Sequence, residues 1–218
     1  MCNLTNTSTL KYIQDMNADN LLKNPPYRKL RGYAFDPSLS LLLDTVGINE
    51  IIYEIPWEEE LGEGPEGEYV KVIDRDPSSD AVYKPVNLNS KEILASNGLS
   101  PSVSNPQFHQ QMVYAVAMNT ITNFEKAIGR KVMWSSGPRD MKTNPTGFVQ
   151  KLLIYPHALR DVNAYYSPDR KALLFGYFNA TPAEVDLAMP GSLVTSLLTC
   201  ACAAVVKTST GPDDGLKP

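Results

Sequence analysis

In the segment 161–178, two apolar, β-type runs stand on either side of a polar turn. The runs are Asn-Ala-Tyr-Tyr at 163–166 and Ala-Leu-Leu-Phe-Gly-Tyr-Phe at 172–178, and both are rich in aromatic and aliphatic residues that favour strands. The turn is Ser-Pro-Asp-Arg at 167–170, in which proline presets φ and aspartate can accept a local hydrogen bond. The pattern predicts a β-hairpin, and the apolar run at 151–158 predicts a further strand just before it.

The longest helical periodicity lies at 107–129. Asn105 is suited to cap the first turn and Pro106 to occupy the first helical position, while Gly129 is a typical residue just beyond a helix end. The positive charge of Lys126 in the last turn interacts favourably with the negative end of the helix dipole. The apolar stripe expected to face the core consists of Phe108, Met112, Ala115, Val116, Ile121, Phe124 and Ile128.

Several shorter β-prone runs precede this helix. Strands are expected at 39–43, 48–55 and 68–74, with an extended segment at 81–89 and a short strand at 132–134. The aspartate-rich stretch 74–80 predicts a β-turn, because it lacks the glycine and the distal glutamate of a calcium-binding loop. Seven glutamates among glycines and prolines at 54–68 predict a solvated acidic loop.

These elements predict an α+β fold, in which a twisted, mostly antiparallel sheet packs one face against the long helix. We expect three regions: a polar N-terminal arm at 1–30 with a possible short helix at 10–22, a folded lobe at 31–194, and a divergent tail at 195–218. With 218 residues, 43% of them hydrophobic, the chain is large enough to bury a sizeable core.

The charge balance argues against a nucleic-acid partner. The chain carries 20 Lys and Arg against 24 Asp and Glu, a formal net charge of −4, whereas phosphate binding needs clustered cations. The first residues lack the features of a secretory signal, and no run is long and apolar enough for a spanning helix. We therefore expect no membrane association and, by default, a cytoplasmic location, although the sequence leaves the compartment open.

Cysteines and histidines are few and far apart. Cys2, Cys200 and Cys202 do not form a disulfide framework, and the Cys-Ala-Cys pair supplies at most half of a tetrahedral metal site. His109 borders the apolar stripe of the helix, and His157 ends the strand at 151–158; each is expected to be structural, with a functional role as the alternative. A zinc ion held jointly by the two histidines and the Cys-Ala-Cys pair is the least favoured arrangement.

The chain resembles the thermolysin-like (gluzincin) zinc metallopeptidases, in the part of their catalytic domain that precedes the zinc-binding helix. The resemblance rests on Asn-Ala-Tyr-Tyr at 163–166 followed by Leu-Leu-Phe-Gly-Tyr at 173–177. The chain is also similar, over 31–194, to a bacterial and fungal group assigned to the same peptidase class. The segments that carry this second similarity are GYAFDPSLSLLLDT, NPQFHQQMVYAVA, PHALRDVNAYY and LLFGYF.

The resemblance implies that the strand at 163–166 borders a peptide-binding cleft. Asn163 and the backbone of Ala164 would hold a substrate chain through hydrogen bonds. Tyr165 and Tyr166 point to opposite faces of a strand, so one is expected in the core and the other beside the cleft. The alternative is that the hairpin is only scaffold.

The family's zinc motif HExxH is not in the sequence, which departs from the family pattern at about Thr195. We therefore expect a metallopeptidase-like protein or fragment without catalytic activity, with no catalytic residues and no metal or cofactor; zinc is expected only in a full-length family member. A truncated product, a frame-altered product and a noncatalytic derivative all fit the sequence.

Two kinds of partner are expected. A peptide or protein could bind at the hairpin edge. The alternative is a noncatalytic protein-binding or structural module that docks a partner on the Asn163–Tyr166 strand edge or on the acidic loop at 54–68. Self-association is also expected, because apolar surface of the hairpin and of residues 195–206 would lose the elements that cover it.

Overall fold

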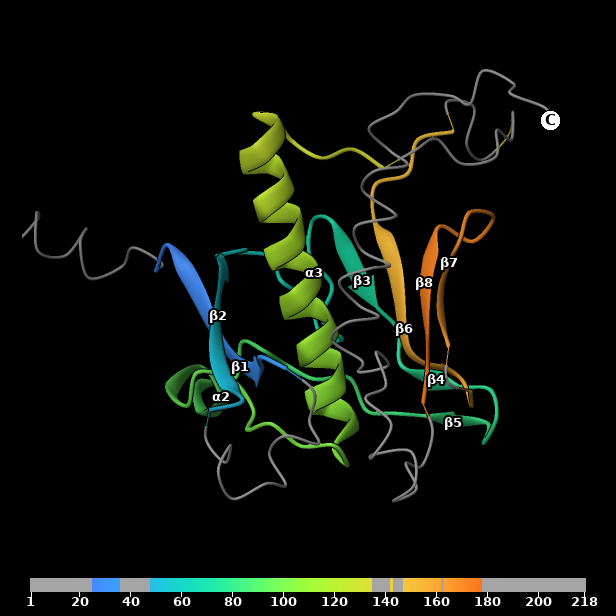
Figure 1. The fold of residues 1–218 in the computed structure, drawn as a ribbon, viewed down its shortest axis with the longest axis horizontal. Coiled ribbons are helices and arrows are strands. Elements are labelled where there is room, and N and C mark those ends of the chain that lie inside the picture. Colours follow the sequence, from blue (N-terminus) through green and yellow to red (C-terminus); the bar gives the residue numbers. More distant parts are fainter. Residues whose placement is uncertain (1–24, 36–47, 135–141, 143–146, 162, 178–218) are drawn as a thin grey trace, which may run out of the picture.

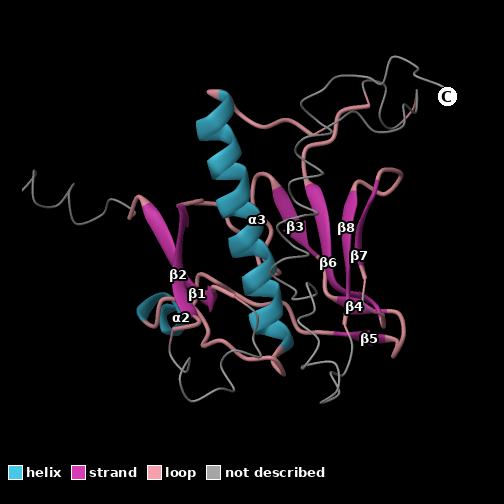
Figure 2. Cartoon of the chain, viewed as in Figure 1, coloured by secondary structure: helices cyan, strands magenta, loops and turns pink. Residues whose placement is uncertain are grey.

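The computed structural model describes residues 25–35, 48–134, 142, 147–161 and 163–177. The expected elements at 10–22 and 39–43 and the tail at 195–218, with Cys200 and Cys202, lie outside these residues. Within them the fold contains α-helices and β-strands, as the α+β prediction states (Figure 2). The strands are β1 (Tyr27–Tyr33), β2 (Glu50–Pro56), β3 (Val70–Val72), β4 (Arg75–Asp76), β5 (Ala81–Val82), β6 (Leu152–Leu159), β7 (Ala164–Ser167) and β8 (Ala172–Gly176). The helices are α2 (Lys91–Ala95) and α3 (Pro106–Ile128).

Helix α3 begins and ends where the sequence predicts. The Asn105 side chain accepts a hydrogen bond from the backbone N–H of Gln107 at 3.0 Å, and Pro106 occupies the first turn. Gly129 follows the helix with φ of 68°, a left-handed conformation that costs glycine little. Local chemistry therefore fixes both ends of the helix.

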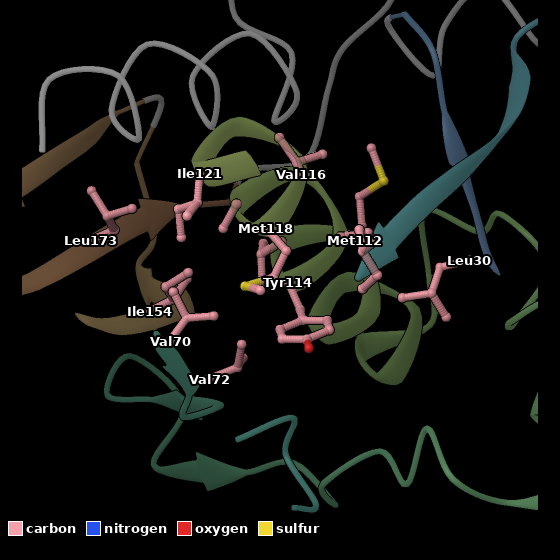
Figure 3. Packing of buried hydrophobic residues seen from close by; sticks show 14 of the residues in the cluster. Leu30, Val70, Val72, Met112, Tyr114, Val116, Met118, Ile121, Ile154 and Leu173 are labelled. Carbon is pink, nitrogen blue, oxygen red and sulfur yellow. The ribbon is translucent and has the colours of Figure 1, made fainter. Parts of the chain in front are cut away.

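The position of α3 differs from the prediction. It lies between two sheets, with β1 and β2 on one side and β3 and β6 on the other (Figure 1). Figure 3 shows Met112 on the side of Leu30 in β1, and Ile121 on the side of Ile154 and Leu173. Consecutive residues from Gln110 to Met118 are therefore buried, and the helix has no single apolar stripe along this stretch.

The sheets are also arranged differently from a single antiparallel sheet. Antiparallel pairs join β1 to β2, β4 to β5 and β7 to β8. The largest sheet has the order β3-β6-β8-β7, and β3, β6 and β8 run parallel. Only its last pair is antiparallel, so the largest sheet is mixed.

Strand β1 was not predicted, because a charged side chain occupies one of its inward positions. Buried and more exposed residues alternate along most of β1, and the inward Arg28 is only 1% exposed. Its guanidinium donates to the Leu88 carbonyl at 2.6 Å and to Asn89 Oδ1 at 2.7 Å, and it stacks on the Trp57 ring at 4.3 Å. These partners make an arginine acceptable where the pattern calls for an apolar residue.

The segment 54–68 contains the end of β2 and then a loop, in which the glutamates at 59, 60, 63 and 68 are exposed as predicted. The loop is nevertheless packed on the fold, which its composition does not predict. Leu61 is buried, and Glu58 accepts hydrogen bonds from the Glu68 backbone N–H at 2.9 Å and from the Tyr114 hydroxyl. The loop also lies along the outer edge of β3, where Val72 N–H donates to the Pro65 carbonyl at 3.0 Å. The loop therefore covers one edge of the main sheet.

Of three other short elements, one was predicted correctly. Residues 132–134 form no strand; instead the Trp134 indole donates to the Tyr69 carbonyl at 2.9 Å. The turn expected in 74–80 is present between β4 and β5, and the Asp76 side chain accepts from the Ser78 backbone N–H at 2.8 Å. The short helix α2, capped by Ser90, was not predicted.

The hairpin face is less exposed than expected. In β8 the residues from Ala172 to Phe175 are all buried, and Tyr165 in β7 is the exposed large apolar side chain of the hairpin. The expectation of an uncovered hairpin surface is therefore wrong for β8, and self-association stays a prediction.

Neither helix in the described part of the chain has the length and apolar character needed to cross a bilayer.

Candidate functional site

The hairpin places the four expected binding residues at the outer edge of the main sheet. β7 pairs with β8 in the register Ala164 to Phe175 and Ser167 to Ala172, and residues 168–171 make the turn. Lys171 closes that turn with a φ of 50°. Among the described strands, β7 pairs on one side only, with β8.

The side chains of β7 alternate as the sequence predicts. Tyr166 and Ala164 pack against the hydrophobic core, whereas Tyr165 is 46% exposed on the other face. Asn163, just before the strand, is exposed as well. One tyrosine therefore anchors the strand and the other stands at the surface.

The backbone of β7 alternates between its partner strand and the open edge. The Gly176 N–H donates to the Asn163 carbonyl at 2.7 Å, so the backbone of Asn163 faces β8. Because opposite residues in an antiparallel pair alternate between bonded and non-bonded positions, the N–H and C=O of Ala164 point away from β8. Ala164 thus presents a donor and an acceptor at the edge.

A second polar site joins three residues that the sequence did not connect. His109 Nδ1 and His157 Nε2 are 2.9 Å apart, and His157 Nδ1 is 2.6 Å from Asp74 Oδ1. His157 and Asp74 are both buried. The result is a continuous hydrogen-bonded chain from a carboxylate through one imidazole to the next.

The sheet topology explains why these residues lie together. Asp74 follows β3, His157 lies near the carboxyl end of β6, and Tyr177 follows β8, so Asp74, His157 and Tyr177 all lie at the same end of the parallel strands. The first turn of α3 delivers His109 to that end. The carboxyl ends of parallel strands are also where ligands commonly bind in α/β sheets.

Neighbouring polar groups fix the orientation of the Asp74 side chain and of the Asp76 side chain in β4. Gln110 Nε2 donates to Asp74 Oδ2 at 2.8 Å, and the Tyr177 hydroxyl donates to Asp76 Oδ2 at 2.5 Å. Burial alone would raise the pKa of Asp76, but hydrogen bonds from Ser79, Tyr177 and Ser78 outweigh burial and lower that pKa to about 2. The Asp76 carboxylate is therefore ionised throughout the neutral and mildly acidic range.

His109 is held in its neutral form. Burial is the main cause that lowers its pKa, to about 4, and the charge of His157 acts in the same direction. The Asp74 carboxylate and the backbones of Ser102 and Val103 act in the opposite direction but do not outweigh burial. This histidine therefore stays neutral at pH values where an exposed histidine would bind a proton.

The histidine site does not fit a zinc ion of the metallopeptidase kind. Both facing ring nitrogens are directed at each other, and the remaining ring nitrogen of His157 is used by Asp74. No group of three or more His, Cys, Asp or Glu side chains in the described residues is arranged to hold a metal ion. In the described residues, the ring nitrogens and the carboxylate are instead joined to one another by hydrogen bonds.

The sequence held only a weak signal for this site. The chain has two histidines, which are 48 residues apart, and His157 is 83 residues from Asp74. Such separations show no helical or strand spacing. His109 has no second histidine at helical spacing in the sequence, and the structure supplies its partner, His157, from β6.

Comparison of this chain with protein-family models, with curated proteins and with solved structures gives no match.

Proposed function

We propose that this chain is a metallopeptidase-like lobe that holds an extended peptide along the outer edge of β7 and does not itself cleave it. The observation that carries the proposal is the edge position of β7, which pairs with β8 alone among the described strands. A peptide can add to such an edge through main-chain hydrogen bonds.

The two edges of the main sheet differ, and this difference favours β7. The edge at β3 is covered by the acidic loop, since Val72 N–H donates to the Pro65 carbonyl and Gly67 N–H donates to the Val70 carbonyl, at 3.0 and 2.9 Å. At β7 the backbone of Ala164 points outward. Among the described strands, β7 therefore has an edge that a strand-forming partner could extend.

The side chains around Ala164 suit an extended peptide. Tyr165 offers an exposed aromatic face beside the edge, and the Asn163 amide has both a donor and an acceptor. These are the residues that the gluzincin resemblance assigns to substrate binding. Their arrangement supports a peptide-binding role, and the metallopeptidase relationship remains part of the proposal.

The acidic loop is the less favoured docking site. Glu66 is paired within the chain with Lys71 at 2.8 Å and with Lys151 at 2.7 Å, and Glu58 bonds the Tyr114 hydroxyl. Two of its glutamates thus stabilise the fold.

The peptide-binding proposal predicts that Ala164→Pro weakens binding. Proline removes the outward N–H and is tolerated on an edge strand whose N–H faces solvent. Loss of one backbone hydrogen bond costs about 1 kcal/mol, or roughly fivefold to tenfold in Kd. The measurement is a titration of the isotopically labelled chain with a panel of short unstructured peptides that alternate apolar and polar residues, followed by amide chemical shifts.

The control for this titration is Ala164→Ser, which keeps the N–H and is expected to bind as the parent chain does. Shift changes should centre on β7 and should not extend to β3. Peptide binding that is equally strong in the proline variant, or that shifts only β3 and the acidic loop, would contradict the proposed site.

The second prediction concerns catalysis. Purified protein supplied with zinc ions is expected to hydrolyse casein no faster than buffer, because the sequence has no HExxH motif to supply two histidine ligands and a glutamate base. The assay measures released peptides with and without a chelator. Hydrolysis that requires zinc and stops on chelation would overturn the noncatalytic part of the proposal.

A further inference from the structure

The contact between His109 and His157 joins two parts of the fold that are far apart in sequence. His109 lies in the first turn of α3, and His157 lies in β6 between Tyr155 and Leu159, where the pairing of β6 with β8 shifts register. Their ring nitrogens are 2.9 Å apart. This hydrogen bond therefore ties the start of the helix to the end of a central strand.

Proton counting limits the charge that this contact can carry. A carboxylate only accepts hydrogen bonds, so His157 Nδ1 carries the hydrogen that bonds Asp74. One hydrogen then lies between His157 Nε2 and His109 Nδ1, donated by either ring. The hydrogen bond is compatible with a pair that is neutral or carries one positive charge.

A second positive charge is incompatible with the contact. With both rings fully protonated, two N–H groups would face each other across 2.9 Å, with no acceptor between them. The two like charges would also repel each other in a partly buried site. The rings must then move apart.

Among the described residues, one carboxylate is bonded directly to the pair. Asp74 bonds His157, while the nearby Asp76 is engaged by Tyr177 and Ser79. In the described part of the chain, the other groups that face the pair are the rings of Tyr83 and Tyr177 on His157, and the ring of Phe108 and the backbones of Ser102 and Val103 on His109. One carboxylate balances one imidazolium and not two.

We propose that the His109–His157 contact is a proton-responsive latch, which holds the start of α3 against β6 when the pair carries at most one positive charge and opens when both rings are protonated. Below, "latch" means this pair of residues with Asp74. The proposal concerns the response of the fold to acid and does not depend on peptide binding.

The direction of the pH response follows from the lowered pKa of His109. In the unfolded chain a histidine takes up its proton near pH 6.5, whereas in the folded chain His109 does so at about pH 4. The unfolded state therefore binds more protons between these values. The stabilisation is fully present above about pH 6.5 and is lost as the pH falls towards 4, on the order of a hundredfold in the unfolding equilibrium constant.

Nuclear magnetic resonance of the ring nitrogens tests the latch without any substitution. The chain has two histidines, so every imidazole signal comes from this pair. We expect the second protonation to occur well below pH 6.5. Hydrogen-exchange protection of the first turn of α3 and of the end of β6 should fall with it, while β1 and β2 keep their protection.

Two results would overturn the proposal. One is independent titration of both histidines near pH 6.5. The other is unchanged protection of the first turn of α3 after the second proton has bound.

His109→Gln provides a second measurement. Glutamine can donate a hydrogen bond to His157 but takes up no proton. We expect the midpoint of urea unfolding to be nearly independent of pH between 6.5 and 5 in this variant and to fall in the parent chain; below that range Glu66 and Glu125, whose pKa values are lowered by their hydrogen bonds, also lose stabilisation in both proteins. The same fall in both proteins would show that other groups cause it; Asp76 is not expected to contribute there, because its lowered pKa places its loss of stabilisation between about 3.8 and 2.

Discussion

Replacing Gly176 with alanine is expected to lower the free energy of unfolding by about 3 kcal/mol or more and to detach the start of β7 from β8. A β-carbon at this position would lie 2.1 Å from the Asp161 carbonyl oxygen and 2.7 Å from the Asn163 carbonyl oxygen. Both are backbone atoms, so no side-chain rotation relieves the clash. The measurement is urea unfolding followed by circular dichroism.

The substitution should also affect binding, because Gly176 N–H holds the Asn163 carbonyl at 2.7 Å. Under conditions where the variant remains folded, peptide affinity at β7 should fall along with stability. Gly62→Ala is the matched control, since a β-carbon there makes only ordinary contacts with Glu66, at 3.5 Å or more. Equal stability of the two variants would contradict the close approach of the chain at Gly176.

Replacing Gln110 with leucine is expected to cost about 2–4 kcal/mol of stability, although leucine is apolar and similar in size. Gln110 is fully buried, and its side chain accepts from the Val86 backbone N–H at 2.8 Å and donates to Asp74 Oδ2 at 2.8 Å. Leucine would leave both of these groups without that partner inside the protein. Urea unfolding at neutral pH measures the loss.

Gln107→Leu on the same helix is the control. No side-chain hydrogen bond of Gln107 contributes to the described network, and the side chain is only half buried, so its replacement should change stability by about 0.5 kcal/mol or less. Similar small losses in both variants would mean that water satisfies Asp74 and Val86 once Gln110 is gone. The Gln110 variant should in addition shift the histidine titrations, because Asp74 loses the group that orients it.

The latch and the β7 edge are connected through the end of β6. Tyr177 N–H donates to the Leu159 carbonyl at 3.0 Å, and Gly176 N–H donates to the Asn163 carbonyl at 2.7 Å. His157 lies two residues before Leu159 on the same strand. The backbone of β6 and these two hydrogen bonds therefore link His157 to the start of β7.

The sequence by itself determined the elements whose signals are local. The ends of α3 follow from Asn105, Pro106 and Gly129, each of which acts on backbone groups within a few residues. The hairpin of β7 and β8 follows from two β-type runs and the turn between them. The opposite orientation of Tyr165 and Tyr166 follows from the twofold repeat of a strand.

The tertiary structure decided everything that depends on partners distant in sequence. The α+β class was predictable, but the parallel pairing of β3, β6 and β8 and the burial of α3 between two sheets were not. The acidic loop is ordered because it pairs with the edge of β3 and because Lys71 and Lys151 balance Glu66. The amino-acid composition of the loop does not predict these pairings.

The candidate site divides in the same way. The residues at the edge of β7 are contiguous, so their pattern could be read along the chain. The latch joins residues from β6, from α3 and from the segment after β3, and its hydrogen bonds exist only because the ends of parallel strands meet the first turn of the helix. The sequence supplied the two imidazoles and the carboxylate, and the fold brought them within hydrogen-bonding distance, where burial lowers the pKa of His109.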